Sequence, residues 1–118
     1  MLHWEPALVF SSTLGTRVPF PGVADYAGTK SAMLGYARGV ARDLGQRNIT
    51  VNVIQPGIMP TDIAAGVAGN LPDAIMDLHA IRRIAMLEEV AATVCFLAGP
   101  NASYVTGGIV DVGGGVQI

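Results

Sequence analysis

Residues 7–30 read ALVFSSTLGTRVPFPGVADYAGTK and join a short apolar run to the start of a long helical pattern. The run Ala7–Phe10 has the length and composition of a strand that is buried on both faces. The loop after it contains Pro21-Gly22, a turn signal, and a helix is expected to begin soon after that turn. This stretch therefore predicts a strand, a loop and a helix in that order.

Three side chains in this stretch are candidates for chemistry. Tyr26 and Lys30 are four residues apart, so on an α-helix they lie on one face, one turn from each other. A phenol has an ordinary pKa of about 10 and is a poor general base at neutral pH, but a nearby ammonium favours the phenolate and lowers that pKa. Ser12 ends the predicted strand, where its hydroxyl can hydrogen-bond a substrate oxygen. The alternative is an exposed tyrosine, a solvated lysine and a serine that caps a strand end.

The pattern continues as a long helix and a second strand. From 24 to 47, apolar and small residues recur at steps of three and four. Residues 49–55, ITVNVIQ, form a β-branched run that Pro56-Gly57 ends. A strand, a helix and a strand in this order predict a right-handed crossover between parallel strands. Because ligands gather at the carboxyl ends of parallel strands, Ser12, Tyr26 and Pro56-Gly57 are expected at one rim of the sheet.

The rest of the chain adds one helix and one strand. A clear helical pattern covers residues 87–97, and a last strand is predicted over 109–112, before three glycines. Residues 61–85 are less regular and are expected to cover the substrate, or to be an ordinary surface connection. We therefore expect one partial α/β domain over residues 1–118, with three parallel strands and helices, part of a doubly wound Rossmann fold.

Composition narrows the class of protein. The chain has 118 residues, which suffices for one domain, and its mean hydropathy of +0.47 is high, as in sheets buried on both faces. The net charge is −2 without a basic block, which argues against nucleic acid and anionic membranes as partners. No apolar run is long enough for a membrane span, and the first residues lack the pattern of a secretory signal.

The single cysteine, Cys95, fits a reducing cytoplasm and is expected to be a buried structural thiol. His3 and His79 show no metal-ligand spacing and are expected at the surface.

Taken together, the motifs resemble the short-chain dehydrogenase/reductase family. The matching pieces are SS at the first strand end, YAGTK for Tyr-x-x-x-Lys, NVIQPG followed by Thr61, EEVA with FLAG, and YVTGG before a glycine-rich end. In this order they cover nearly all of the chain. Within the family, the chain is similar to the carrier-protein ketoreductases, and its ARDLGQRNITVNVIQPG segment is also similar to the cyclic-di-GMP-binding biofilm dispersal mediators.

The resemblance implies an NAD(P)-dependent oxidoreductase that transfers hydride between nicotinamide and a small-molecule carbonyl or alcohol. Tyr26 would be the general acid/base, Lys30 would tune it and hold the nicotinamide ribose, and Ser12 would bind the reacting oxygen. The residues implied to bind NAD or NADP are Tyr26, Lys30, Pro56, Gly57, Ile58 and Thr61. The family also implies a homo-oligomer, a dimer or tetramer, through the small-residue face of the helix over 24–47.

Two departures from the family pattern shape the expectation. The glycine-rich turn that holds the cofactor pyrophosphate does not occur ahead of Ser12, and Gly113 stands where the family usually has aspartate. The chain resembles the carboxyl half of such an enzyme, so by itself we expect it to be inactive and to associate through its unpaired first strand. The alternatives are a non-catalytic regulator that responds to a nucleotide, cyclic-di-GMP, and a gene remnant without function.

Overall fold

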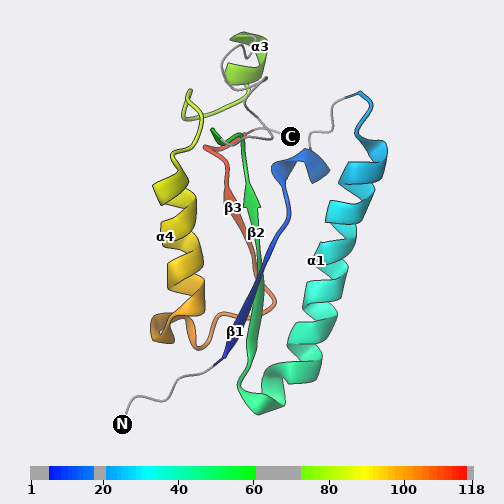
Figure 1. Ribbon diagram of the computed structural model, residues 1–118, viewed down its shortest axis with the longest axis vertical. Coiled ribbons are helices and arrows are strands. Elements are labelled where there is room, and N and C mark those ends of the chain that lie inside the picture. The colour runs from blue at the N-terminus through cyan, green and yellow to red at the C-terminus, as the bar shows by residue number, and fades with distance from the viewer. Residues whose placement is uncertain (1–5, 18–20, 61–72, 117–118) are drawn as a thin grey trace.

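A computed structural model describes residues 6–17, 21–60 and 73–116 of the chain (Figure 1). The predicted strands, the long helix and the later helix all form, with ends within a few residues of those expected. The elements in chain order are β1 (Ala7–Ser11), α1 (Ala24–Leu44), β2 (Thr50–Pro56), α3 (Asp73–Met76), α4 (Leu87–Ala98) and β3 (Ile109–Val112). Short 3-10 turns occupy Leu14–Thr16, Gly45–Arg47 and Pro100–Ala102.

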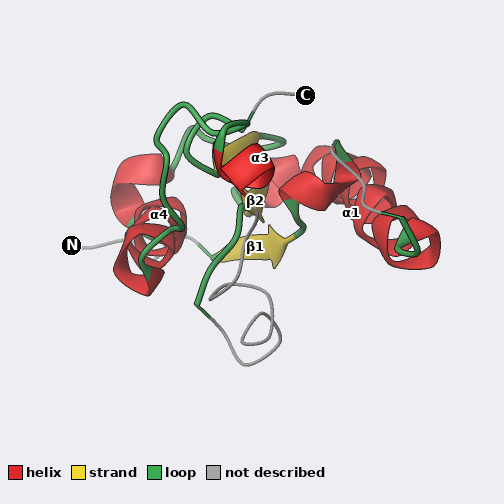
Figure 2. Ribbon diagram, turned by 90° about the horizontal axis from the view of Figure 1, so that it is seen from above, coloured by secondary structure: helices red, strands yellow, loops and turns green. Residues whose placement is uncertain are grey.

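The three strands form one parallel sheet in the order β1-β2-β3. In its register, Ala7 lies opposite Thr50 and Val53 lies opposite Ile109. Helices α1 and α4 cover opposite faces of this sheet, as Figures 1 and 2 show from two directions. The predicted partial α/β fold with three parallel strands is confirmed.

Strand β2 is the centre of the core because its side chains alternate between the two helices. All seven of its residues are buried, as expected for a strand that has strand neighbours on both edges and helices on both faces. The cluster on the α1 face consists of Ala37, Ala41, Val51 and Val53. The cluster on the α4 face consists of Ile54, Val90 and Leu97. Each fully buried valine, leucine or isoleucine contributes about 1.5–3 kcal/mol relative to an exposed one.

Two expectations about single residues are wrong. Cys95 is exposed, because the buried stripe of α4 runs through Val90 and Leu97 and leaves the cysteine on the outer side of the helix. His79, which lies just after α3, is 7 % exposed, and its Nδ1 atom is 2.9 Å from the Ile75 carbonyl oxygen. His3 lies outside the described residues. None of the helices in the described ranges has the length and hydropathy needed to span a bilayer.

Candidate active site

The predicted site residues come from three elements that meet at one end of the sheet. Ser12 directly follows β1, Pro56 is the last residue of β2, and Tyr26 lies in the first turn of α1. In Figure 1 the carboxyl ends of the strands and the beginning of α1 lie at the same end of the molecule, beside α3. The expectation that separate segments converge on one rim is therefore met.

The three predicted catalytic residues form a cluster that Lys30 joins, because its backbone contacts the Ser12 hydroxyl and its side chain lies near the Tyr26 ring. The Ser12 hydroxyl donates to the Lys30 carbonyl oxygen at 2.9 Å, and the Lys30 ammonium donates to the Ser11 carbonyl oxygen at 3.1 Å. The Lys30 Nζ atom is 5.8 Å from the centre of the Tyr26 ring. These contacts tie the first turns of α1 to the end of β1.

The three side chains differ in how they meet solvent. Ser12 is 4 % exposed, whereas 54 % of Tyr26 is exposed, so the phenol is open to a ligand while the serine is enclosed. The single hydroxyl proton of Ser12 is engaged by Lys30 O, so the hydroxyl can accept from an alcohol as it stands but must rotate to donate to a carbonyl. The Lys30 ammonium has three N–H donors, and its bond to Ser11 O uses one of them.

The corner after β2 is held by backbone hydrogen bonds. The Gly57 N–H donates to Val112 O at 3.0 Å, and Ile58 O accepts from the Ala85 N–H at 3.0 Å. A Cβ on Gly57 would lie 2.9 Å from the Gly113 Cα, so this glycine is required for packing. Thr61, the remaining predicted cofactor residue, lies outside the described residues.

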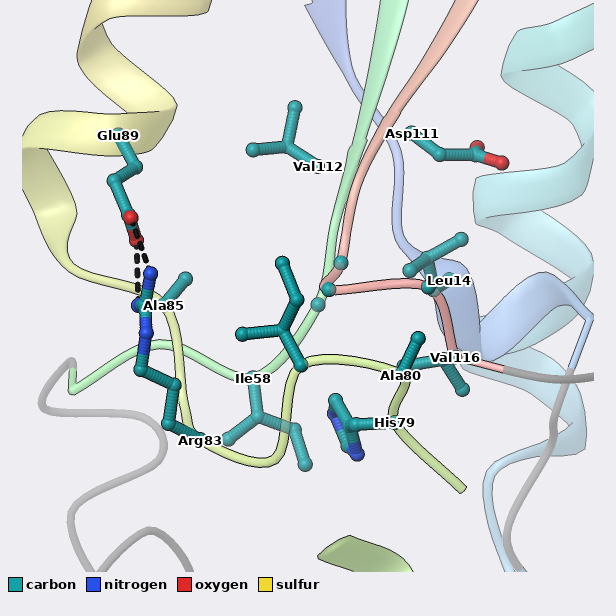
Figure 3. Close-up of a pocket in the computed structure, with 15 residues that line it drawn as sticks. Leu14, Ile58, His79, Ala80, Arg83, Ala85, Glu89, Asp111, Val112 and Val116 are labelled. Atoms are coloured by element: carbon teal, nitrogen blue, oxygen red, sulfur yellow. Dashed lines mark hydrogen bonds and ion pairs between the residues drawn. The ribbon is translucent and has the colours of Figure 1, made fainter. Parts of the chain in front are cut away.

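Two clefts open at this end of the sheet, and they differ in their relation to the predicted residues. The larger, of about 530 Å³, lies over the ends of β2 and β3 and is walled by residues 79–85 and the glycines 113–115 (Figure 3). The smaller, of about 150 Å³, lies between the loop after Ser12, the corner at Pro56, Gly57 and Ile58, and residues 75–79. Neither is lined by Ser12, Tyr26 or Lys30. The smaller cleft is the better candidate for a ligand site, because it adjoins both the serine loop and the predicted cofactor corner.

An ion pair at the wall of the larger cleft was not anticipated from the sequence. Arg83 binds both carboxylate oxygens of Glu89, at 2.9 and 2.6 Å, and Figure 3 shows the pair on the α4 side of the cleft. Glu89 also accepts from the Met86 N–H at 2.9 Å, which caps the start of α4. The Arg83 hydrogen bond, followed by the Met86 N–H, lowers the pKa of Glu89 from 4.5 to about 2. The pair is structural, since each charge is neutralised by the other.

Three further contacts hold the loop that follows Ser12, and sequence reasoning missed them. Gln55 on β2, Asp111 on β3 and Gly113 after β3 each contact residues 13–17. Gln55 could have been noticed as a polar residue in a strand that is expected to be buried on both faces. The Arg17–Asp111 ion pair joins residues 94 positions apart, a separation at which a sequence carries no local signal.

The sequence comparisons with known proteins match reductases and a related binding protein over most of this chain. Residues 1–117 match the family described as enoyl-(acyl carrier protein) reductase. The chain is 49% identical over 107 residues to the cyclic-di-GMP-binding biofilm dispersal mediator protein of Escherichia coli (strain K12), covering 91% of this chain and 45% of that protein. It is 35% identical over 106 residues to the 3-oxoacyl-[acyl-carrier-protein] reductase FabG of Chlamydia trachomatis, covering 90% of this chain and 42% of that protein.

Solved structures agree. A short-chain dehydrogenase/reductase from Serratia marcescens superposes with a TM-score of 0.87 at 39% identity, over 99% of this chain and 48% of that one. BdcA in complex with NADPH superposes with a TM-score of 0.86 at 43% identity, over 97% of this chain and 47% of that one. The chain spans about half the length of the relatives it matches.

Proposed function

This chain belongs to the short-chain dehydrogenase/reductase family, and from that premise we propose that it serves an NAD(P)-dependent hydride transfer between nicotinamide and a carbonyl or alcohol. The observation that carries the proposal is the cluster of Ser12, Tyr26 and Lys30 at the rim of the sheet. Hydride chemistry is supplied by the cofactor when it is bound.

Each residue of the cluster has a distinct proposed role. The Tyr26 phenol gives its proton to the carbonyl oxygen during reduction and takes it back during oxidation. The Lys30 ammonium offers its remaining N–H donors to the ribose hydroxyls. The Ser12 hydroxyl turns from Lys30 O to the reacting oxygen and holds it beside the phenol. Proton transfer by a positioned side chain of this kind accounts for about 10² to 10⁴ in rate.

The described residues are proposed to hold one end of a dinucleotide. Lys30 and the corner at Pro56–Ile58 are proposed to hold the nicotinamide ribose and carboxamide. The described ranges contain no glycine-rich strand–turn–helix of the kind that cradles a pyrophosphate. We therefore propose that the 118 residues by themselves bind nicotinamide nucleotides weakly and do not turn over.

The substrate side is proposed to be the smaller cleft. Residues 61–85 would cover the substrate, and the described part of that segment places Ile75, Leu78 and His79 in the cleft wall. In the complete enzyme, the small-residue face of α1 is proposed to pack in a dimer or tetramer.

The binding proposal can be tested with the two halves of the dinucleotide. Nicotinamide mononucleotide is titrated into the ¹⁵N-labelled chain, and AMP is the matched control. We expect the mononucleotide to shift the amides of Lys30, Gly57 and Ile58, and AMP to leave them in place. Lys30→Met should abolish the shifts. Mononucleotide shifts confined to other residues would contradict the proposed cofactor site.

The chemistry is tested by NADPH oxidation with a panel of ketones, measured by absorbance. We expect no turnover by the purified chain. Turnover that is lost in Tyr26→Phe would overturn the proposed inactivity and support the proposed role of the phenol.

A nucleotide-responsive regulator is the second candidate, because the chain is 49% identical to a relative described as cyclic-di-GMP-binding. The same labelled chain is titrated with cyclic-di-GMP. Saturable shifts with cyclic-di-GMP and none with nicotinamide mononucleotide would favour the regulator. A gene remnant predicts that neither ligand binds.

A further inference from the structure

We propose that Gln55 is a positioning residue that holds the backbone around Ser12 for the reaction, an inference that rests on the proposed function. Gln55 is not expected to touch substrate or cofactor, because it is 1 % exposed and lines neither cleft. It acts through the loop that begins at Ser12.

Two consecutive residues of β2 hold the serine segment. The Ser12 N–H donates to the Ile54 carbonyl oxygen at 2.8 Å. The side-chain amide of Gln55 then donates to the Thr13 carbonyl oxygen at 3.2 Å and to the Thr16 hydroxyl oxygen at 2.8 Å. The peptide group before Ser12 and the peptide group after Thr13 are thereby fixed to the central strand of the sheet.

The orientation of the Gln55 amide follows from its partners. A backbone carbonyl oxygen can only accept, so the NH₂ group must face Thr13. The other amide atom, Oε1, is buried, and it receives no hydrogen bond from any residue in the described ranges. A buried acceptor without a donor destabilises a fold, so the amide is better explained by what its NH₂ group holds than by its contribution to stability.

The neighbouring strand supports the same loop. Asp111 of β3 is the register partner of Gln55, and its carboxylate pairs with Arg17 at the far end of the loop. Leu14 lies in the loop between Thr13, which Gln55 holds, and Arg17, which Asp111 holds. It is 7 % exposed and packs against Gly113. The loop is thus held at three points, of which Gln55 is the one nearest to Ser12.

The position of the loop determines where the serine hydroxyl lies. Ser12 Oγ reaches Lys30 O only because the end of β1 is held close to the first turns of α1. Losing the Gln55 donor releases Thr13, so that, in the described part of the chain, the Ser12 N–H bond to Ile54 O is the remaining hydrogen bond between this end of the loop and β2. We therefore expect the effect of Gln55 to appear first in the conformation of Ser12.

The test uses Gln55→Glu, which keeps the shape of the side chain but makes the donor depend on protonation. A neutral carboxyl can donate its O–H to Thr13 O, whereas a carboxylate cannot and is repelled by that oxygen. Gln55→Met, of similar volume and without a donor, is the control. The readouts are amide hydrogen exchange at Ser12, Thr16 and Arg17 and the Ser12 Cβ chemical shift, which follows its rotamer. Amides of α4 between Val94 and Leu97 serve as the reference.

We expect exchange at the loop amides of Gln55→Glu to be at least tenfold faster at pH 7.5 than in the parent chain, with the α4 amides unchanged. Near pH 4.5 the loop amides and the Ser12 Cβ shift should return toward their parent values. At both pH values, the loop amides of Gln55→Met should exchange faster than those of the parent chain at the same pH.

Three results would overturn the proposal. One is a ratio of loop exchange in Gln55→Glu to loop exchange in the parent chain that is the same at both pH values. Another is a uniform change at loop and α4 amides, which indicates a purely structural role, and failure of both variants to fold would indicate the same. These readouts do not depend on activity, so the two proposals can fail separately. If the loop responds as expected but the chain does not bind nicotinamide mononucleotide, the proposed function fails and the structural inference about Gln55 stands.

Discussion

Strand β1, ALVFS, is more apolar than its neighbour β2, TVNVIQP, yet all seven residues of β2 are buried and none of the five residues of β1 is. β2 pairs on both edges, whereas within the described chain β1 pairs with β2 alone. The candidate site draws on both strands, because Ser12 follows β1 and Pro56 ends β2. The comparison teaches that burial here depends on how many neighbours a strand has, rather than on how apolar its residues are.

The largest difference should appear when the same charge is placed on each strand. Val53 of β2 is 1 % exposed, and Leu8 of β1 is 43 % exposed. We expect Val53→Asp to destabilise the chain by about 4 kcal/mol or more, because its carboxylate would be buried without a partner. Leu8→Asp should remain folded. Circular dichroism during urea unfolding measures both, and equal losses would contradict the comparison.

The open edge of β1 should make the chain associate. In a parallel pair, alternate residues point their N–H groups toward the partner strand. Since the Ser12 N–H donates to Ile54 O, the Phe10 N–H also faces β2 and the Val9 N–H faces the open edge. Val9→Pro should weaken association while the sheet is kept, whereas Phe10→Pro removes a ladder bond and should cost about 3 kcal/mol. Sedimentation velocity over a range of concentrations tests this, and a monomeric parent chain with a sharp melt would refute it.

The packing between Leu14 and Gly113 links the β1 end to the β3 end across β2. A Cβ on Gly113 would lie 1.8 Å from Leu14 Cδ1, so the two side chains cannot both be present without a shift. We expect Gly113→Ala to cost about 1–3 kcal/mol by overpacking. Adding Leu14→Ala should recover part of that loss, because the clash is removed. A double-mutant cycle on the free energy of unfolding measures the coupling, and strictly additive effects would show that the contact is absent.

The helix that covers one face of β2 offers a smaller effect. A Cβ on Gly35 or Gly39 of α1 meets nothing within 4 Å. In the monomer, Gly35→Ala and Gly39→Ala should each stabilise the chain by up to about 1 kcal/mol, because alanine is the better helix former. If this face packs in the proposed oligomer, the same substitutions should instead weaken self-association. Thermal melts at low and high concentration distinguish the two cases.

The smallest effect is expected at the start of α4, which covers the other face of β2. The pKa of Glu89 is lowered from 4.5 to about 2, chiefly by its hydrogen bond to Arg83. A lowered carboxyl pKa stabilises the folded chain above the unfolded value, and that stability is lost as the pH falls from about 4.5 to about 2. The loss should be shallower in Glu89→Gln. If the free energy of unfolding falls with pH equally in both proteins across this range, the exposed pair contributes little to stability.

The order of the elements could be predicted because periodicity and turn residues act locally. The β-branched run before Pro56 and the three- and four-residue steps after Ala24 each indicate one element regardless of the rest of the chain. The convergence of Ser12, Tyr26 and Pro56 was also predictable, since parallel strands place their carboxyl ends at one rim.

Other features could not be predicted from local patterns. His79 and Cys95 were assigned to the wrong environments, because burial of a single residue depends on which neighbours fold over it. Gln55 was overlooked because its partners, Thr13 and Thr16, lie about forty positions earlier in the chain.

Local sequence patterns were enough to predict the strand–helix–strand order, the parallel sheet and the spacing that puts a phenol and an ammonium on one helical turn. The folded chain was needed to learn that the Ser12 hydroxyl faces Lys30 O, that Gly113 leaves room for Leu14 and that β2 is enclosed while β1 is not. Backbone preferences and side-chain periodicity are properties of a few consecutive residues, whereas hydrogen-bond partners and burial depend on segments that meet only after folding.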